Sequence, residues 1–84
     1  MLLDYVQAAM RRAAYKLLPD SEGFFAEIPG FAGVWADADS LEQAREELQQ
    51  VLEDWILVRL RRNQDLPVVD GLDLNPKPPG QEAA

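Results

Sequence analysis

An uninterrupted helix-forming run in the second half of the chain is the feature that most constrains its fold. Residues 41–62 contain neither glycine nor proline. The run follows Ser40, whose hydroxyl can cap a helix while the side chain of Gln43 reaches back to complete a capping box. Apolar side chains recur along one stripe, at Leu41, Ala44, Leu48, Val51, Leu52, Trp55, Ile56 and Val58. We therefore expect one long amphipathic helix of about 33 Å, since each residue adds about 1.5 Å.

Leu57 falls almost opposite this stripe, and two interpretations of it remain open. A single exposed leucine is common on protein surfaces and is the simpler explanation. Alternatively, the segment WILV at 55–58 is apolar all round for one turn, as expected where a helix contacts both its own core and a partner. On the second interpretation, Leu57 is a candidate interface residue.

Three short β-prone runs precede the helix and predict a small antiparallel sheet. Residues 14–18 and 24–28 are separated by the turn-forming sequence PDSEG, which is typical of a hairpin. Residues 34–37 form the third run, after a Pro29-Gly30 pair that suits the centre of a type II turn.

Both faces of this predicted sheet carry aromatic side chains. The alternation of a strand puts Phe24, Ala26 and Ile28 on one face and Phe25 and Glu27 on the other, and it places Trp35 opposite Val34 and Ala36. One long helix covers only one face of a sheet well. The N-terminal helix, a second subunit or a partner must therefore cover the other face.

The two ends of the chain complete the expected architecture. Residues 2–13 have the apolar spacing of a short helix, and Val68 and Val69 predict a short fourth strand. Residues 75–84 contain three prolines and no large apolar side chain, which predicts a disordered tail. The expected fold is α+β in the order α-β-β-β-α-β: a three-stranded antiparallel sheet plus a short fourth strand, packed by one long helix, with an extra N-terminal helix, in one domain of residues 1–74.

The composition excludes several classes of function. The 84 residues include 15 acidic and 8 basic side chains, for a formal net charge of −7, and there is no histidine or cysteine. This charge balance argues against direct binding of nucleic acid. The missing side chains remove disulfides and the commonest metal ligands, nucleophiles and bases. We expect a non-enzyme without metal or other cofactor and, with no membrane span or signal-peptide pattern, a cytoplasmic protein.

Carboxylates are the only plentiful reactive groups that remain. Asp37, Asp39 and Glu42 lie close together in the sequence, and oxygen ligands of this kind can hold Mg²⁺. Acidic residues ahead of a helix also cap it and face solvent, which is the interpretation that we favour. Ser21 falls in a loop and Ser40 is occupied as a cap, so neither is a candidate nucleophile.

Residues 14–67 resemble the HicB family of antitoxins and HicB-like domains. The family motif is a strand with the pattern E-x-P-G-x-x-G, then a capped helix ending in L-e-d-w, then a proline. The matching residues are, in order, Phe25, Glu27, Pro29, Gly30, Gly33, Ser40, Glu42, Ala44, Leu48, Leu52, Trp55 and Pro67. Ala38 and Ser40 stand where many relatives have glycine and threonine.

The resemblance implies a partial ribonuclease H-like fold with its fourth strand beside the first. It also implies a homo-oligomer, a dimer or a tetramer, and a HicA-like toxin as partner, which is a small basic protein that cleaves mRNA. An acidic chain suits such a partner. The sequence after Pro67 shows no helix-turn-helix or ribbon-helix-helix pattern, so we do not expect direct DNA binding by this chain.

On this basis the candidate residues fall into two groups. The candidate partner-binding or interface residues are Phe25, Glu27, Phe31, Trp35 and Leu57. The family-signature residues expected to be structural are Pro29, Gly30, Gly33, Ser40, Ala44 and Trp55. No catalytic or metal-binding residue is proposed.

Two alternative functions remain. The chain can be an orphan domain that self-associates and serves another protein partner. The implied ribonuclease H-like fold also suggests a metal-dependent nuclease as a function. Such a nuclease needs a carboxylate within the first strand. That strand carries Lys16 and no acid, and Asp70 would stand alone, so the nuclease is the least favoured alternative.

Overall fold

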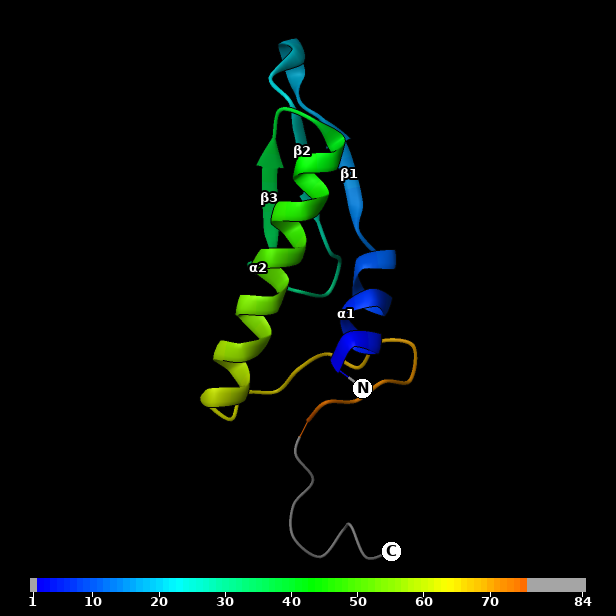
Figure 1. Ribbon diagram of the computed structural model, residues 1–84, viewed down its shortest axis with the longest axis vertical. Coiled ribbons are helices and arrows are strands. Elements are labelled where there is room, and N and C mark those ends of the chain that lie inside the picture. The colour runs from blue at the N-terminus through cyan, green and yellow to red at the C-terminus, as the bar shows by residue number, and fades with distance from the viewer. Residues whose placement is uncertain (1, 76–84) are drawn as a thin grey trace, which may run out of the picture.

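The computed structural model describes residues 2–75 of the chain. Its elements are α1 (Leu2–Arg11), β1 (Ala14–Leu17), a short 3-10 turn η1 (Pro19–Ser21), β2 (Phe24–Glu27), β3 (Trp35–Ala38) and α2 (Leu41–Arg61) (Figure 1). The order α-β-β-β-α confirms the predicted α+β class. Neither helix in this part of the chain is long and apolar enough to cross a membrane.

Helix α2 begins where the sequence predicts. The backbone N–H of Gln43 donates to the Ser40 hydroxyl oxygen at 3.1 Å, which satisfies one of the N–H groups left free at a helix start. The buried side chains of α2 recur at every fourth position, at Ala44, Leu48, Leu52 and Ile56. This stripe faces the sheet and the core, and the half-buried Val51, Trp55 and Leu60 pack along its edges.

The sheet has the order β1-β2-β3, and both pairs of strands are antiparallel. Helix α2 packs against β2 and β3, across the face that carries the buried Ala26 and Ala36. Ala44 on the helix is also fully buried. Three small side chains at this contact let the helix backbone lie close to the strands, so the core at this end of the molecule is thin.

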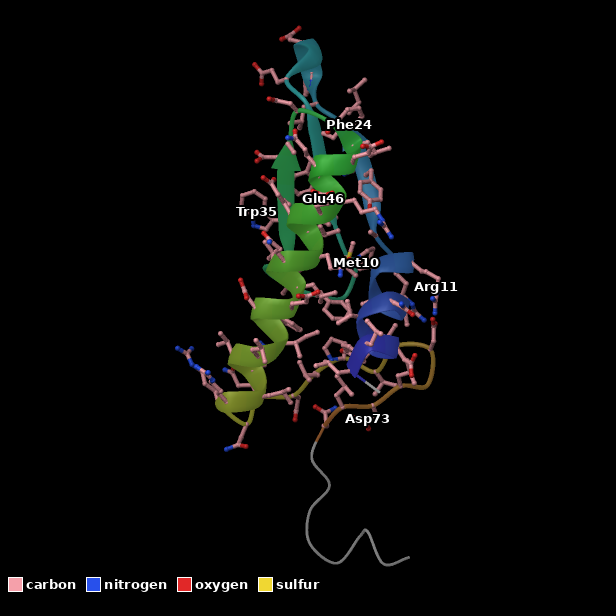
Figure 2. All side chains as sticks on the ribbon, viewed as in Figure 1. Met10, Arg11, Phe24, Trp35, Glu46 and Asp73 are labelled. Atoms are coloured by element: carbon pink, nitrogen blue, oxygen red, sulfur yellow. The ribbon has the colours of Figure 1, made fainter. Side chains whose placement is uncertain are left out.

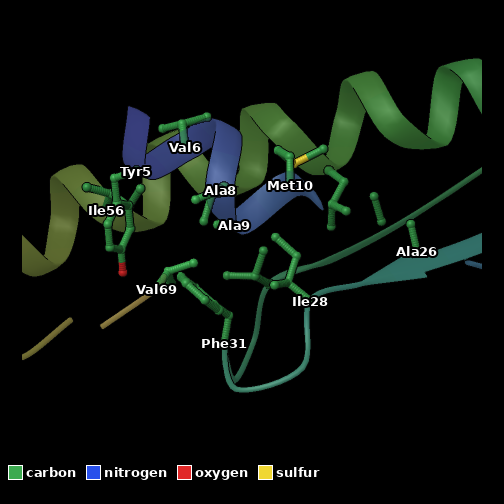
Figure 3. Close-up of a cluster of buried hydrophobic side chains, with 14 of the residues drawn as sticks. Tyr5, Val6, Ala8, Ala9, Met10, Ala26, Ile28, Phe31, Ile56 and Val69 are labelled. Carbon is green, nitrogen blue, oxygen red and sulfur yellow. The ribbon is translucent and has the colours of Figure 1, made fainter. Parts of the chain in front are cut away.

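A second part of the core lies at the other end, where α1 packs beside the C-terminal half of α2 (Figure 1). Tyr5 of α1, Phe31 from the β2–β3 loop, Ile56 of α2 and Val69 form one buried cluster (Figure 3). Helix α1 therefore packs chiefly against α2 and does not cover the open face of the sheet. This removes the N-terminal helix from the three candidates for covering that face.

The expected fourth strand at Val68 and Val69 does not form within residues 2–75. Val69 makes a single antiparallel bridge to Leu72, in which each backbone N–H donates to the other residue's carbonyl, at 3.1 and 2.7 Å. Asp70 and Gly71 between them both have positive φ, 49° and 78°. A turn of this kind reverses the chain after two residues and ends its extension.

Residues 66–75 form instead a strap that holds α1, and we call them the C-terminal strap. The hydroxyl of Tyr5 donates to the carbonyl oxygen of Pro67, and Arg12 pairs with Asp70. Asn75 closes the strap: its side chain accepts from the N–H of Leu66 at 2.6 Å and donates to the Leu66 carbonyl at 2.9 Å. The disordered tail predicted for residues 75–84 therefore does not include Asn75, which is held by these hydrogen bonds. Residues 76–84 lie outside the described residues.

Candidate partner-binding surface

The face of the sheet that points away from α2 is the strongest candidate site, and we call it the outer face. The strand register places Phe25 opposite Asp37 and Glu27 opposite Trp35 on this face. Lys16 of β1 lies opposite Phe25 on the other side. Within residues 2–75 both helices pack elsewhere, because α2 covers the opposite face and α1 lies against α2.

Two aromatic side chains form the centre of the outer face. The rings of Phe25 and Trp35 stack with their centroids 5.9 Å apart and their planes 25° from parallel. They are diagonal neighbours across the β2–β3 pair, a separation that aromatic side chains can span. Trp35 is 53% exposed and projects on the side of β3 away from α2 (Figure 2). A large, rigid and exposed aromatic of this kind is typical of a protein interface.

The loop between β2 and β3 forms a shallow hollow next to these rings. The loop consists of two consecutive turns. In the first, the N–H of Phe31 donates to the carbonyl oxygen of Ile28 at 3.0 Å, and in the second, the N–H of Val34 donates to the carbonyl oxygen of Phe31 at 3.1 Å. Gly30 has φ +89°, as the third position of the predicted type II turn requires. The hollow measures about 350 Å³ and lies between this loop and the side chains of Phe25, Glu27 and Trp35.

Phe31 is predicted as a contact residue, but the structure places it in the core. It is only 5% exposed, and its ring lies 6.3 Å from that of Tyr5 and 5.2 Å from that of Trp55. Phe31 thus anchors the loop from beneath, and the turns on either side of it are exposed. An apolar residue between two turn pairs is the sequence signal for such an anchor.

Three of the signature residues expected to be structural, Ser40, Ala44 and Trp55, pack or form hydrogen bonds within the fold. The Trp55 ring contacts the ring of Phe31 and also the guanidinium of Arg59, whose central carbon is 4.6 Å from the Trp55 ring centroid. Arg59 also donates to the carbonyl of Asp65 at 2.9 Å, which fixes the chain just after α2. Ser40 caps α2 and Ala44 is buried beneath the sheet.

Carboxylates surround the far end of β3 and make that surface strongly negative. A second hollow of about 420 Å³ is lined by Glu22, Asp37, Ala38, Asp39, Gln43 and Glu47. Within the described residues, no three carboxylates lie close enough to hold a metal ion. The arrangement instead offers an acidic border that adjoins the outer face at Asp37.

Other residues of interest lie away from the outer face. Leu57 is 51% exposed and lies beside Leu2 and Leu3 of α1, so the predicted contact residues belong to two surfaces. Asp70, the carboxylate considered for a nuclease, lies on the strap and forms an ion pair with Arg12.

Lys16 and Asp37 belong to the outer face but are not among the predicted site residues. Asp37 follows from the strand alternation, because it lies two positions along β3 from Trp35. Lys16 follows from the register of the hairpin, in which it lies opposite Phe25.

Comparison with known proteins places this architecture in a family. The sequence pattern of the UPF0150-like family matches residues 4–67, which run from α1 to the start of the strap. The chain belongs to the UPF0150-like family. UPF0150 protein ssl0259 of Synechocystis sp. is 40% identical over 48 residues, which are 57% of this chain and 66% of that relative. The match therefore spans just under two thirds of the relative's own length.

A solved structure shares the fold of this UPF0150-like chain. The crystal structure of TTHA0281 from Thermus thermophilus superposes with a TM-score of 0.83 at 37% sequence identity, over 92% of this chain and 95% of that one.

Proposed function

We propose that this protein is a non-catalytic antitoxin of the HicB type, which binds a small basic, mRNA-cleaving toxin of the HicA type and blocks it. The observation that carries the proposal is the stacked pair of the half-buried Phe25 and the exposed Trp35, on a sheet face that neither helix covers within the described residues. The resemblance of residues 14–67 to HicB-like domains supplies the kind of partner.

The chemistry of the outer face suits a basic protein. The aromatic pair offers apolar area with little side-chain entropy to lose on binding. Glu27 and Asp37 lie on the same face, and the acidic hollow adjoins it. Together with a net charge of −7, these carboxylates favour fast association with a positively charged partner.

The same residues support a binding role without catalysis. The chain has no histidine or cysteine, and the Ser40 hydroxyl is engaged as a helix cap. A ribonuclease H-like nuclease needs an acid in its first strand, and β1 contains Lys16 but no acid, while Asp70 is paired with Arg12. We therefore do not propose the metal-dependent nuclease.

Co-expression with a small basic toxin of the HicA type, taken from the neighbouring reading frame where one is encoded there, tests the proposal. We expect rescue of growth from the toxin and co-purification of a complex. Trp35→Ala should raise the dissociation constant about 30-fold, or about 2 kcal/mol, because it removes a central aromatic contact. Val68→Ala is the matched control, since Val68 is as exposed as Trp35 but lies on the strap.

Two outcomes would contradict parts of the proposal. The absence of both complex and rescue would remove the antitoxin function. A complex that tolerates Trp35→Ala as well as Val68→Ala would move the binding site away from the outer face. Both affinities are to be measured by titration calorimetry on variants whose circular dichroism matches the parent.

The second candidate function is a self-associating domain that serves another protein. The exposed Leu57 beside Leu2 and Leu3 favours it. A chain that self-associates but neither binds nor neutralises the basic protein would support this candidate over the antitoxin.

A further inference from the structure

A groove runs between α1 and the C-terminal half of α2, on residues that the outer face does not use. Its volume is about 400 Å³, and its lining is aliphatic except for one carboxylate: Leu2, Leu3, Val6, Glu53, Ile56 and Leu57. Leu2, Leu3 and Leu57 are 47%, 65% and 51% exposed. We call this feature the α1–α2 groove. Three half-exposed leucines around one hollow form a connected apolar surface, unlike a single exposed side chain.

The charges on α2 are arranged symmetrically about Leu57. Glu53 lies four residues before it and Arg61 four residues after it, and side chains four apart form one ridge along a helix. All three side chains are exposed. Glu53 accepts a hydrogen bond from Gln49 at 3.0 Å. Within residues 2–75, neither Glu53 nor Arg61 forms an ion pair.

We propose that the α1–α2 groove binds a second copy of this chain, through a two-fold contact centred on Leu57. In this contact the two α2 helices run antiparallel, because a two-fold axis at Leu57 reverses the direction of one helix relative to the other. Glu53 of each copy then faces Arg61 of the other, since both lie about 6 Å along the helix from Leu57. Leu57 of each copy enters the groove of the other, beside Leu2 and Leu3.

The chemistry of the groove favours a second copy over a basic partner. A basic protein would place positive charge against Arg61, whereas a second copy provides Glu53. Aliphatic contacts at the centre with charged pairs at the border are typical of homodimer interfaces. A chain of this size also buries a small share of its surface alone, so a second copy adds to a limited core.

This inference does not depend on the proposed antitoxin function. The groove and the outer face share no residue, so each copy in the dimer keeps its outer face for another protein. A chain that does not bind the toxin would not contradict the proposed dimer, and a chain that does not dimerise would not contradict toxin binding.

Analytical ultracentrifugation of the full chain from micromolar to millimolar concentration tests the contact. We expect a monomer–dimer equilibrium, and Leu57→Glu should raise its dissociation constant at least about 30-fold, since it buries two like charges at the centre of the contact. Leu41→Glu is the matched control. Leu41 is on the same helix and 47% exposed, and an acidic residue suits the first turn of a helix.

A charge exchange tests the antiparallel register. Glu53→Arg places two pairs of positive side chains against each other, and Arg61→Glu places two pairs of negative ones. Each should weaken the dimer about tenfold at low salt. The double variant restores opposite charges with reversed order, and its dissociation constant should return to within about threefold of the parent value.

The inference is overturned by a chain that stays monomeric at every concentration, or by a dimer that Leu57→Glu weakens no more than Leu41→Glu does. A double variant no stronger than the two single variants overturns the register. Circular dichroism spectra that match the parent exclude loss of folding as the cause, and these exposed positions give no reason to expect such loss.

Discussion

The outer face and the α1–α2 groove are two open apolar surfaces of one small molecule, but they are built in different ways. Apart from Lys16 of β1, the outer face takes its side chains from one short part of the sequence, residues 25–37, and the pairing of β2 with β3 positions them. The groove joins Leu2 and Leu3 near the start of the chain to Ile56 and Leu57 near the end of α2.

The contacts that support the two surfaces differ in the same way. Local turns hold the β2–β3 loop beneath the outer face. The groove depends on the strap, where the Tyr5 hydroxyl reaches Pro67 and Arg12 reaches Asp70. The local surface is aromatic and acidic and suits a different protein, whereas the long-range surface is aliphatic and symmetric in charge and suits a second copy. Substitutions should therefore be able to damage either surface and leave the other.

Gly23→Ala should have the largest effect, and it acts on the sheet. Gly23 has φ +109°, and an added Cβ would lie 2.4 Å from the carbonyl oxygen of Ala38. Ala38 is paired with Phe24 at the end of β3, so the clash pushes the two strands apart. We expect the free energy of unfolding to fall by about 2–4 kcal/mol. Urea denaturation measures it.

Gly30→Ala is the matched control for this clash. Gly30 also has a positive φ, +89°, but no heavy atom lies within 4 Å of its added Cβ. Only backbone strain remains, at about 1–2 kcal/mol. Equal losses for the two variants would show that the contact with Ala38 carries no cost.

Tyr5→Phe should have an intermediate effect, and it acts on the groove. The change removes the hydrogen bond from the Tyr5 hydroxyl to the Pro67 carbonyl and keeps the ring beside Phe31. The free energy of unfolding should fall by about 1 kcal/mol. Because α1 loses one of its attachments to the strap, self-association should weaken while toxin binding stays unchanged. Equal weakening of both would contradict the separation of the two surfaces.

The pH dependence of stability provides a second measurement on the same variant. Burial of Tyr5, and to a lesser degree the nearby Asp73 carboxylate, raises the pKa of its hydroxyl above the usual value of 10.0. The unfolded chain therefore releases this proton first as pH rises. The stabilisation is complete below about pH 10 and is lost as pH rises through the folded pKa.

We accordingly expect the parent to lose stability more steeply above pH 10 than Tyr5→Phe does. Denaturant titrations across that range measure the difference, and Tyr15, present in both proteins, contributes equally to each. Identical slopes would show that Tyr5 ionises alike in the folded and unfolded chain.

Arg12→Ala should have the smallest effect on the strap. The side chains of Arg12 and Asp70 are 51% and 45% exposed, so solvent screens their ion pair. We expect a loss of about 0.5 kcal/mol or less, smaller still at high salt. A double-mutant cycle with Asp70→Asn measures the coupling. A coupling well above about 1 kcal/mol would mean that charge, and not the buried Leu66 and Val69, holds the strap in place.

The elements governed by local pattern are the ones that the sequence predicts well. Ser40 and the uninterrupted run after it predict the start and length of α2, and strand alternation places Phe25 and Trp35 on the outer face. The same alternation, continued by one step along β3, adds Asp37, and the pairing of the predicted hairpin adds Lys16 opposite Phe25. These features need only neighbouring residues to define them.

The features that depend on contacts between distant parts of the chain are not predicted. Phe31 is drawn inward by Tyr5 and Trp55, which lie far from it in the sequence. The position of α1 beside α2, and with it the groove, requires the strap to be in place. The prediction of a strand at the strap is wrong, although its Asp70-Gly71 pair between apolar residues is a strong turn signal.

The hydrogen bond between Tyr5 and Pro67 joins the first helix to a segment that is synthesised only after α2. As the chain leaves the ribosome, the sheet and α2 can form from neighbouring sequence while α1 still lacks the residues that hold it. The final folding step is then the docking of α1 under the strap. The groove exists only after this step, so two chains cannot pair through it until residues 66–75 of each have been made.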